Sequence, residues 1–146
     1  GRKGLLLRAA QRRVDRQAET ECPSVNWLLV AIGGGLGAVA RYALSGWLLP
    51  HTLQQKFPWP TFAVNVLGCL VAGTLFAFAA KHDAFSPNLR LFLFTGVLGG
   101  FTTFSAFGLE TAHLLKRGEV GIAVAYVVFS VLCGIGSIAL AYRLSP

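Results

Sequence analysis

Residues 96–107 read GVLGGFTTFSAF, and this stretch decides what kind of fold the chain can adopt. It lies in a charge-free segment, 91–109, which is apolar enough to cross a bilayer. Glycine and threonine are weak helix formers, so the helix is expected to break near residues 99–103. Carbonyl groups freed at membrane depth are tolerated where they are buried or line a site, and there they can bind a cation. The alternative is a continuous helix that packs closely at Gly99 and Gly100.

Three further segments of about 20 residues or more carry at most one charged residue, which is Arg41. Each is long enough to span a hydrocarbon core of roughly 30 Å as a helix. The connections are short, so neighbouring helices should be antiparallel, and Pro50 is expected to end the first helix. We therefore predict an all-α membrane protein, a four-span domain over 24–146 with spans at about 26–49, 61–80, 89–115 and 119–143.

The composition argues against the soluble classes of protein. Hydrophobic residues make up 54% of the chain and charged residues 13%, whereas soluble domains are about one quarter charged. The pI near 9.9 reflects a basic tail, 1–23, and short loops rather than a basic face on a soluble fold, so nucleic acid is not an expected partner. The tail is expected to be disordered or a surface helix. The sequence contains no carboxylate pair, nucleophile–base set or metal-ligand cluster, so an enzyme is not expected.

Small residues recur in the spans. Gly33, Gly34, Gly35 and Gly37 cluster in the first span, and glycines let helices approach closely in lipid. Close packing, within the chain or in a homo-oligomer, is the preferred interpretation. The three cysteines fit neither a disulfide framework nor a zinc pattern and are interpreted as small packing residues: Cys22, Cys69 and Cys133.

Several polar and aromatic residues within the spans allow two interpretations. Phe104 and Phe107 share one helix face and either pack in the ordinary way or present positive ring edges to a small anion. Asn65 either bonds to a neighbouring helix or donates to an anion. The hydroxyls of Ser105, Tyr126 and Ser130 are further donors, although serine hydroxyls can also bond back to their own helix. Arg41 either marks an aqueous vestibule or snorkels to the interface.

Three motifs then point to a family. They are GGxxGxxxRY from Gly33, FPxxTFxxNxxG from Phe57, and GxxGGxTTFSxF from Gly96. With these motifs, residues 27–144 resemble the Fluc (CrcB) fluoride channels, which are small four-span bacterial proteins. The resemblance implies a fluoride-specific channel that passively exports fluoride across the bacterial plasma (inner) membrane.

The resemblance also implies an assembly and roles for particular residues. The family forms antiparallel, dual-topology homodimers with a structural sodium ion at the centre. By motif, Gly99 and Thr102 would bind sodium through backbone carbonyls and Arg41 would be a vestibule charge. The fluoride pathway would comprise Asn65, Phe104, Ser105, Phe107, Tyr126 and Ser130. Two positions depart from the pattern, because Ala106 and Gly134 stand where hydroxyl residues are common.

Two other classes of membrane protein share part of this pattern. A small multidrug or cation exporter also has four spans, but it would need an embedded carboxylate in the first span, and 26–49 carries none. A non-transporting scaffold subunit would explain the spans and glycines. It would not explain Asn65 together with the TTFS string.

Membrane orientation follows the Lys and Arg residues near span ends. Without the tail and the embedded Arg41, the two sides are balanced, with Lys81, Arg90 and Arg143 against Lys56, Lys116 and Arg117. The tail adds six basic residues to one side. We predict that it biases insertion toward one orientation and lowers the yield of antiparallel dimers.

The test is cysteine accessibility from each side of the membrane, with and without residues 1–23. Removal of the tail should equalise labelling from the two sides. Equal labelling in both versions would show that the tail is irrelevant to topology, and one-sided labelling of the shortened chain would refute dual insertion.

Overall fold

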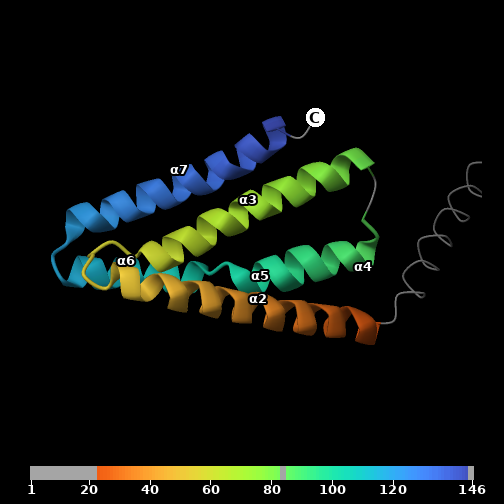
Figure 1. Cartoon of the computed structure of the whole chain (residues 1–146), viewed down its shortest axis with the longest axis horizontal. Coiled ribbons are helices and arrows are strands. Elements are labelled where there is room, and N and C mark those ends of the chain that lie inside the picture. The colour runs from red at the N-terminus through yellow and green to blue at the C-terminus, as the bar shows by residue number, and fades with distance from the viewer. Residues whose placement is uncertain (1–22, 83–84, 145–146) are drawn as a thin grey trace, which may run out of the picture.

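The computed structural model describes residues 23–82 and 85–144, and in these ranges the regular elements are helices (Figure 1). The predicted tail, except for Pro23, lies outside the described residues. The elements are α2 (Pro23–Thr52), α3 (Trp59–His82), α4 (Pro87–Arg90), the π-helix η1 (Leu91–Leu98), α5 (Gly99–Phe101), α6 (Phe104–Lys116) and α7 (Val120–Leu144).

Within the described residues, four helical segments are long and apolar enough to cross a membrane: 24–52, 59–80, 87–116 and 120–144. For these residues, the prediction of an all-helical fold with four helices of membrane-spanning length is confirmed. Many large apolar side chains are exposed on the single chain, among them Trp27 and Leu144. Exposed faces of this kind suit contact with lipid or with another chain.

The first helix continues past its expected end. Pro50 was predicted to end it, but α2 continues to Thr52. Pro50 lies in the last turn, where the missing N–H removes only one intrahelical hydrogen bond and little helix follows. The Thr52 hydroxyl donates to the Leu48 carbonyl at 3.2 Å and so supports this final turn.

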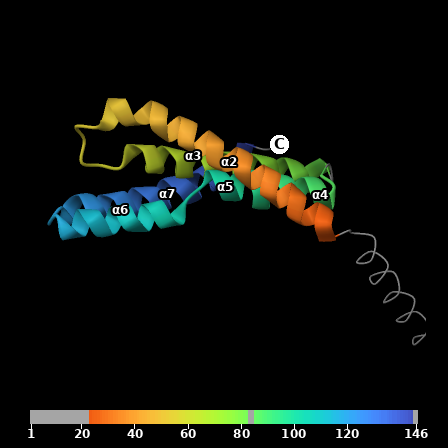
Figure 2. The ribbon, with the colours of Figure 1, turned by 90° about the horizontal axis from the view of Figure 1, so that it is seen from below.

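The helices pack in two pairs. α2 lies along η1 and α5, and α3 lies along α7. Figure 1 shows that α3 and α7 run in the same direction, and Figure 2 shows α2 diverging from α6 and α7. A small buried cluster of Leu114, Ala123 and Tyr126 joins α6 to α7, and Phe57, Phe62, Phe107 and Ile122 pack around it.

The third membrane-length segment is not helical throughout. Gly99 and Gly100 stay helical in α5, while Thr102 (ψ 157°) and Thr103 (ψ 113°) have extended backbone before α6 begins. The Thr103 hydroxyl accepts a hydrogen bond from the Ala106 N–H at 3.2 Å. Thr103 is therefore the N-cap of α6 and satisfies one of the free N–H groups in its first turn.

Glycines make the contact between α2 and the third segment possible. A Cβ on Gly37 would overlap the Val97 carbonyl, and one on Gly100 would overlap the Gly34 carbonyl. A Cβ on Gly35 would meet nothing within 4 Å. The glycine cluster therefore serves close packing within the chain at some positions and leaves others free of contact.

We predict that Gly37→Ala destabilises the protein by about 1–3 kcal/mol, since the backbone of the third segment must move to admit a methyl group. Gly35→Ala is the matched control and should be neutral or slightly stabilising, because alanine is the better helix former. Thermal unfolding of the purified protein in detergent measures both variants. Equal melting temperatures for the two would contradict the packing argument.

Candidate functional site

A cavity of about 280 Å³, open to the outside of the single chain, lies where α3, α6 and α7 meet the extended residues, and we call it the inner cavity. Its lining consists of Asn65, Cys69, Thr102, Thr103, Phe104, Phe107, Ser130 and Val131. The structure thus brings together four residues of the predicted pathway, Asn65, Phe104, Phe107 and Ser130. Four other predicted site residues do not line this cavity, and they are Arg41, Gly99, Ser105 and Tyr126.

The Asn65 side chain is bonded to the backbone of Thr103. Its Nδ2 donates to the Thr103 carbonyl at 3.1 Å, and its Oδ1 accepts from the Thr103 N–H at 2.8 Å. Asn65 is therefore bonded to the third segment, at an extended residue rather than within a neighbouring helix. Donation to an anion, the other interpretation of Asn65, stays open, because a primary amide has two N–H groups and this pair uses only one of them.

Ser130 has a buried side-chain oxygen. This Oγ makes no hydrogen bond within the described part of the chain, so the expected back-bonding to its own helix is not seen for Ser130. A buried hydroxyl without a partner is costly and calls for an explanation. Because Ser130 lines the inner cavity, a polar or anionic ligand there would supply the missing partner.

The two phenylalanines lie side by side. Their ring centroids are 5.5 Å apart with planes tilted by 37°, and the Phe107 ring lies 5.0 Å from the ring of Tyr126. Phe104 is 84% exposed on the single chain, whereas Phe107 packs against the buried cluster. The two rings therefore place aromatic surface at the inner cavity from one helix face.

A partly buried carboxylate, that of Glu110, lies one helical turn beyond Phe107. Glu110 accepts a hydrogen bond from the Thr61 hydroxyl at Oε1 and one from the Tyr126 hydroxyl at Oε2, both at 2.7 Å. This grouping was not predicted, since its members come from three helices. The sequence places Thr61 one helical turn before Asn65, and Tyr126 one turn before Ser130, but this spacing does not indicate that Glu110 joins them.

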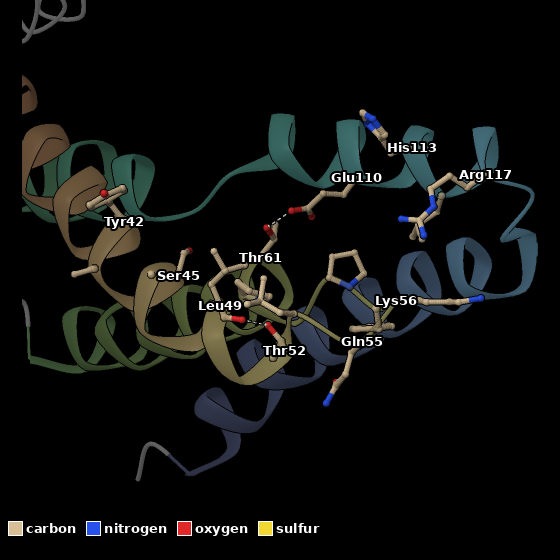
Figure 3. Close-up of a pocket in the computed structure, with 17 residues that line it drawn as sticks. Tyr42, Ser45, Leu49, Thr52, Gln55, Lys56, Thr61, Glu110, His113 and Arg117 are labelled. Carbon is tan, nitrogen blue, oxygen red and sulfur yellow. Dashed lines mark hydrogen bonds between the residues drawn. The ribbon is translucent and has the colours of Figure 1, made fainter.

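A second, larger cavity of about 800 Å³ opens between the end of α2, the loop 53–58 and α6, and we call it the outer cavity (Figure 3). Thr61 and Glu110 line it, as do the basic residues Lys56, His113 and Arg117. Lys56 forms an ion pair with Glu119 at 2.5 Å. The hydrogen bond from Tyr126 to Glu110 therefore connects the wall of the outer cavity to the aromatic residues of the inner one.

Arg41 and Ser105 are held near the extended residues. The Nε of Arg41 donates a hydrogen bond to the Gly100 carbonyl at 3.1 Å. This bond holds the Arg41 side chain against the third segment. Ser105 pairs with the Thr103 hydroxyl at 3.2 Å.

Two carbonyl groups in this region are available to a cation. The Thr103 N–H donates to Asn65 rather than to Gly99 four residues earlier. Within residues 23–82 and 85–144, the carbonyls of Gly99 and Thr102 accept no hydrogen bond, while those of Leu98 and Gly100 do. Hard cations such as sodium prefer oxygen ligands of this kind. The carbonyl groups of Gly99 and Thr102 therefore suit the role of sodium ligands that was predicted for them.

Comparison with known proteins gives a consistent assignment. A family described as "CrcB-like protein, Camphor Resistance (CrcB)" matches residues 28–142. A protein of Methylobacillus flagellatus named "Fluoride-specific ion channel FluC" is 56% identical over 108 residues, which is 74% of this chain and 84% of that protein. Relatives with the same name from Rhodospirillum centenum (51% identity; 76% of this chain, 87% of the relative) and Flavobacterium psychrophilum (44%; 73% and 85%) are also similar.

Proposed function

Because the chain belongs to the CrcB-like family, we propose that it is a fluoride-specific channel that lets fluoride leave the cytoplasm passively and so limits its toxicity. The observation that carries this proposal is the inner cavity, where the buried Ser130 hydroxyl, which has no partner among the described residues, faces a space shared with Asn65 and two phenylalanines. Donors without partners suit an anion. The relatives' name supplies its identity as fluoride.

Fluoride holds its hydration water tightly, so a selective path must replace the lost water with donors close to the ion. The second Nδ2 hydrogen of Asn65 and the Ser130 hydroxyl are such donors. The positive ring edges of Phe104 and Phe107 add weaker ones. Chloride is larger and would fit these fixed groups less closely, which gives the proposed selectivity.

The remaining pathway residues extend this line of donors. Tyr126 lies between the inner cavity and Glu110, and its hydroxyl would turn from Glu110 to donate to fluoride that passes toward the outer cavity. Arg41 keeps a positive charge beside the extended residues and would attract anions into a vestibule. The Ser105 hydroxyl, paired with that of Thr103, would be a further donor along the pathway. In this proposal, the interruption of the third span is what opens the site.

We further propose an antiparallel, dual-topology homodimer in a bacterial inner membrane. The balanced Lys and Arg counts on the two sides support insertion in both orientations. The exposure of Phe104 on the single chain also supports a second copy, which would cover this ring and complete the pathway.

The carbonyls of Gly99 and Thr102 would hold the sodium ion at the dimer centre. Two chains would contribute four carbonyl oxygens, a set suited to a hard cation. The bound ion would supply positive charge that offsets the repulsion between fluoride ions in neighbouring pathways. The chain's own part would be to keep these carbonyls free, because the Thr103 N–H donates to Asn65 and the Ala106 N–H donates to the Thr103 hydroxyl.

The proposed function is tested by passive anion efflux from liposomes that contain the purified protein. We expect fluoride to leave rapidly and chloride to be retained. Phe104→Ile and Phe107→Ile keep bulk but remove the ring edges, so each should slow fluoride efflux about tenfold or more, the loss expected for about 1.4 kcal/mol of stabilisation. Wild-type efflux from both variants would show that the ring-edge mechanism is wrong, and absence of fluoride efflux from the wild-type protein would refute the channel.

A separate experiment tests the sodium ion. Efflux is measured after sodium has been removed during purification and replaced by N-methyl-D-glucamine inside and outside the liposomes. We expect fluoride efflux to fall and to return when sodium is added back. Full activity without sodium or any other small cation would contradict the proposed role.

A further inference from the structure

Two polar stripes face each other between α3 and α7. Residues spaced by four lie on one face of a helix, and these two helices are parallel neighbours. The stripe on α3 is Thr61, Asn65 and Cys69, and the stripe on α7 is Tyr126, Ser130 and Gly134.

Contacts pair the two stripes level by level. At the first level, Thr61 and Tyr126 donate to the same carboxylate of Glu110. At the second level, Asn65 and Ser130 line the same cavity.

At the third level, the Sγ of Cys69 lies 3.4 Å from the position that a Cβ on Gly134 would take. A side chain at residue 134 would thus meet the thiol. The α7 stripe has no donor at this level, and the only side-chain donor of the pair is the thiol of Cys69.

From this arrangement we propose that the Cys69 thiol is a fluoride-binding group of the pathway, standing in for the hydroxyl that Gly134 does not supply. The inference rests on the proposed fluoride-channel function and adds one residue to it. Cys69 lines the inner cavity one turn beyond Asn65, and a thiol is a weak hydrogen-bond donor.

Two observations separate this role from simple packing. The buried Ser130 oxygen in the same cavity has no partner within the described residues, which indicates a ligand there. Cys133, the other cysteine of the described spans, is partly buried but is not among the lining residues. Cys133 therefore provides a matched control within the same protein.

The first experiment compares fluoride efflux from liposomes for Cys69→Ser, Cys69→Val and Cys133→Val. Serine keeps a donor and valine keeps bulk without one. We expect Cys69→Val to slow efflux about fivefold, the effect of losing one hydrogen bond to the ion, while Cys69→Ser and Cys133→Val stay within about twofold of wild type. Wild-type efflux from Cys69→Val, or equal slowing in Cys69→Ser and Cys69→Val, would overturn the donor role.

A double variant tests the pairing with Gly134. Cys69→Ala should slow efflux, and Cys69→Ala/Gly134→Ser should recover most of it, because the serine hydroxyl would occupy the space that the thiol left. The pairing would be contradicted if the double variant showed no recovery of fluoride efflux although its gel-filtration profile and melting temperature matched those of the wild-type protein.

A third measurement keeps Cys69 and modifies its thiol chemically, so it does not depend on whether variants at this residue fold. Methyl methanethiosulfonate transfers a methylthio group to a thiol, forming an S–S bond as methanesulfinate and a proton leave. In a chain whose Cys22 and Cys133 are replaced by serine, Cys69 is the only thiol that can react. We expect this reagent to block fluoride efflux through that chain, and unchanged efflux after treatment would overturn the proposal. If the wild-type protein passes fluoride in these assays, the proposed function stands even where the Cys69 role fails.

Discussion

The reciprocal hydrogen bonding between the Asn65 side chain and the Thr103 backbone is the interaction on which the rest of the structure depends. Extended backbone at membrane depth leaves peptide groups without partners, and each would cost several kcal/mol in lipid. Asn65 satisfies both groups of Thr103 at once. It thereby holds the start of α6 against α3, and it leaves the Gly99 carbonyl without its usual intrahelical donor.

Glycine packing and Arg41 support the same region from the other side. α2 approaches the third segment closely because Gly37 and Gly100 have no side chains at the contact. This approach lets Arg41 reach the Gly100 carbonyl, which would otherwise lack a donor at the end of α5. The polar groups around residues 99–103 are thus satisfied by side chains from two different helices, and only selected carbonyls remain free for a ligand.

Much of the architecture could be predicted from the sequence, because hydropathy is a local property. Four apolar segments of membrane length identified four helices, and each ended within a few residues of its expected limit. Pro50 misled the prediction of one end, since a proline in the last turn removes a single bond. The grouping of Thr61, Glu110 and Tyr126 could not be found in this way, because its partners are 49 and 16 residues apart in the chain.

The sequence by itself determined the four spans, the family and the residue types in the polar stripes, since composition and spacing along a helix decide these without reference to distant contacts. Tertiary structure alone decided which stripe faces which. Parallel packing of α3 on α7 places Cys69 beside Gly134 and Asn65 across a cavity from Ser130. It also decided which carbonyls are free, because that depends on whether a side chain from another helix captures the Thr103 N–H. Such capture is a property of packing between helices, which no local pattern encodes.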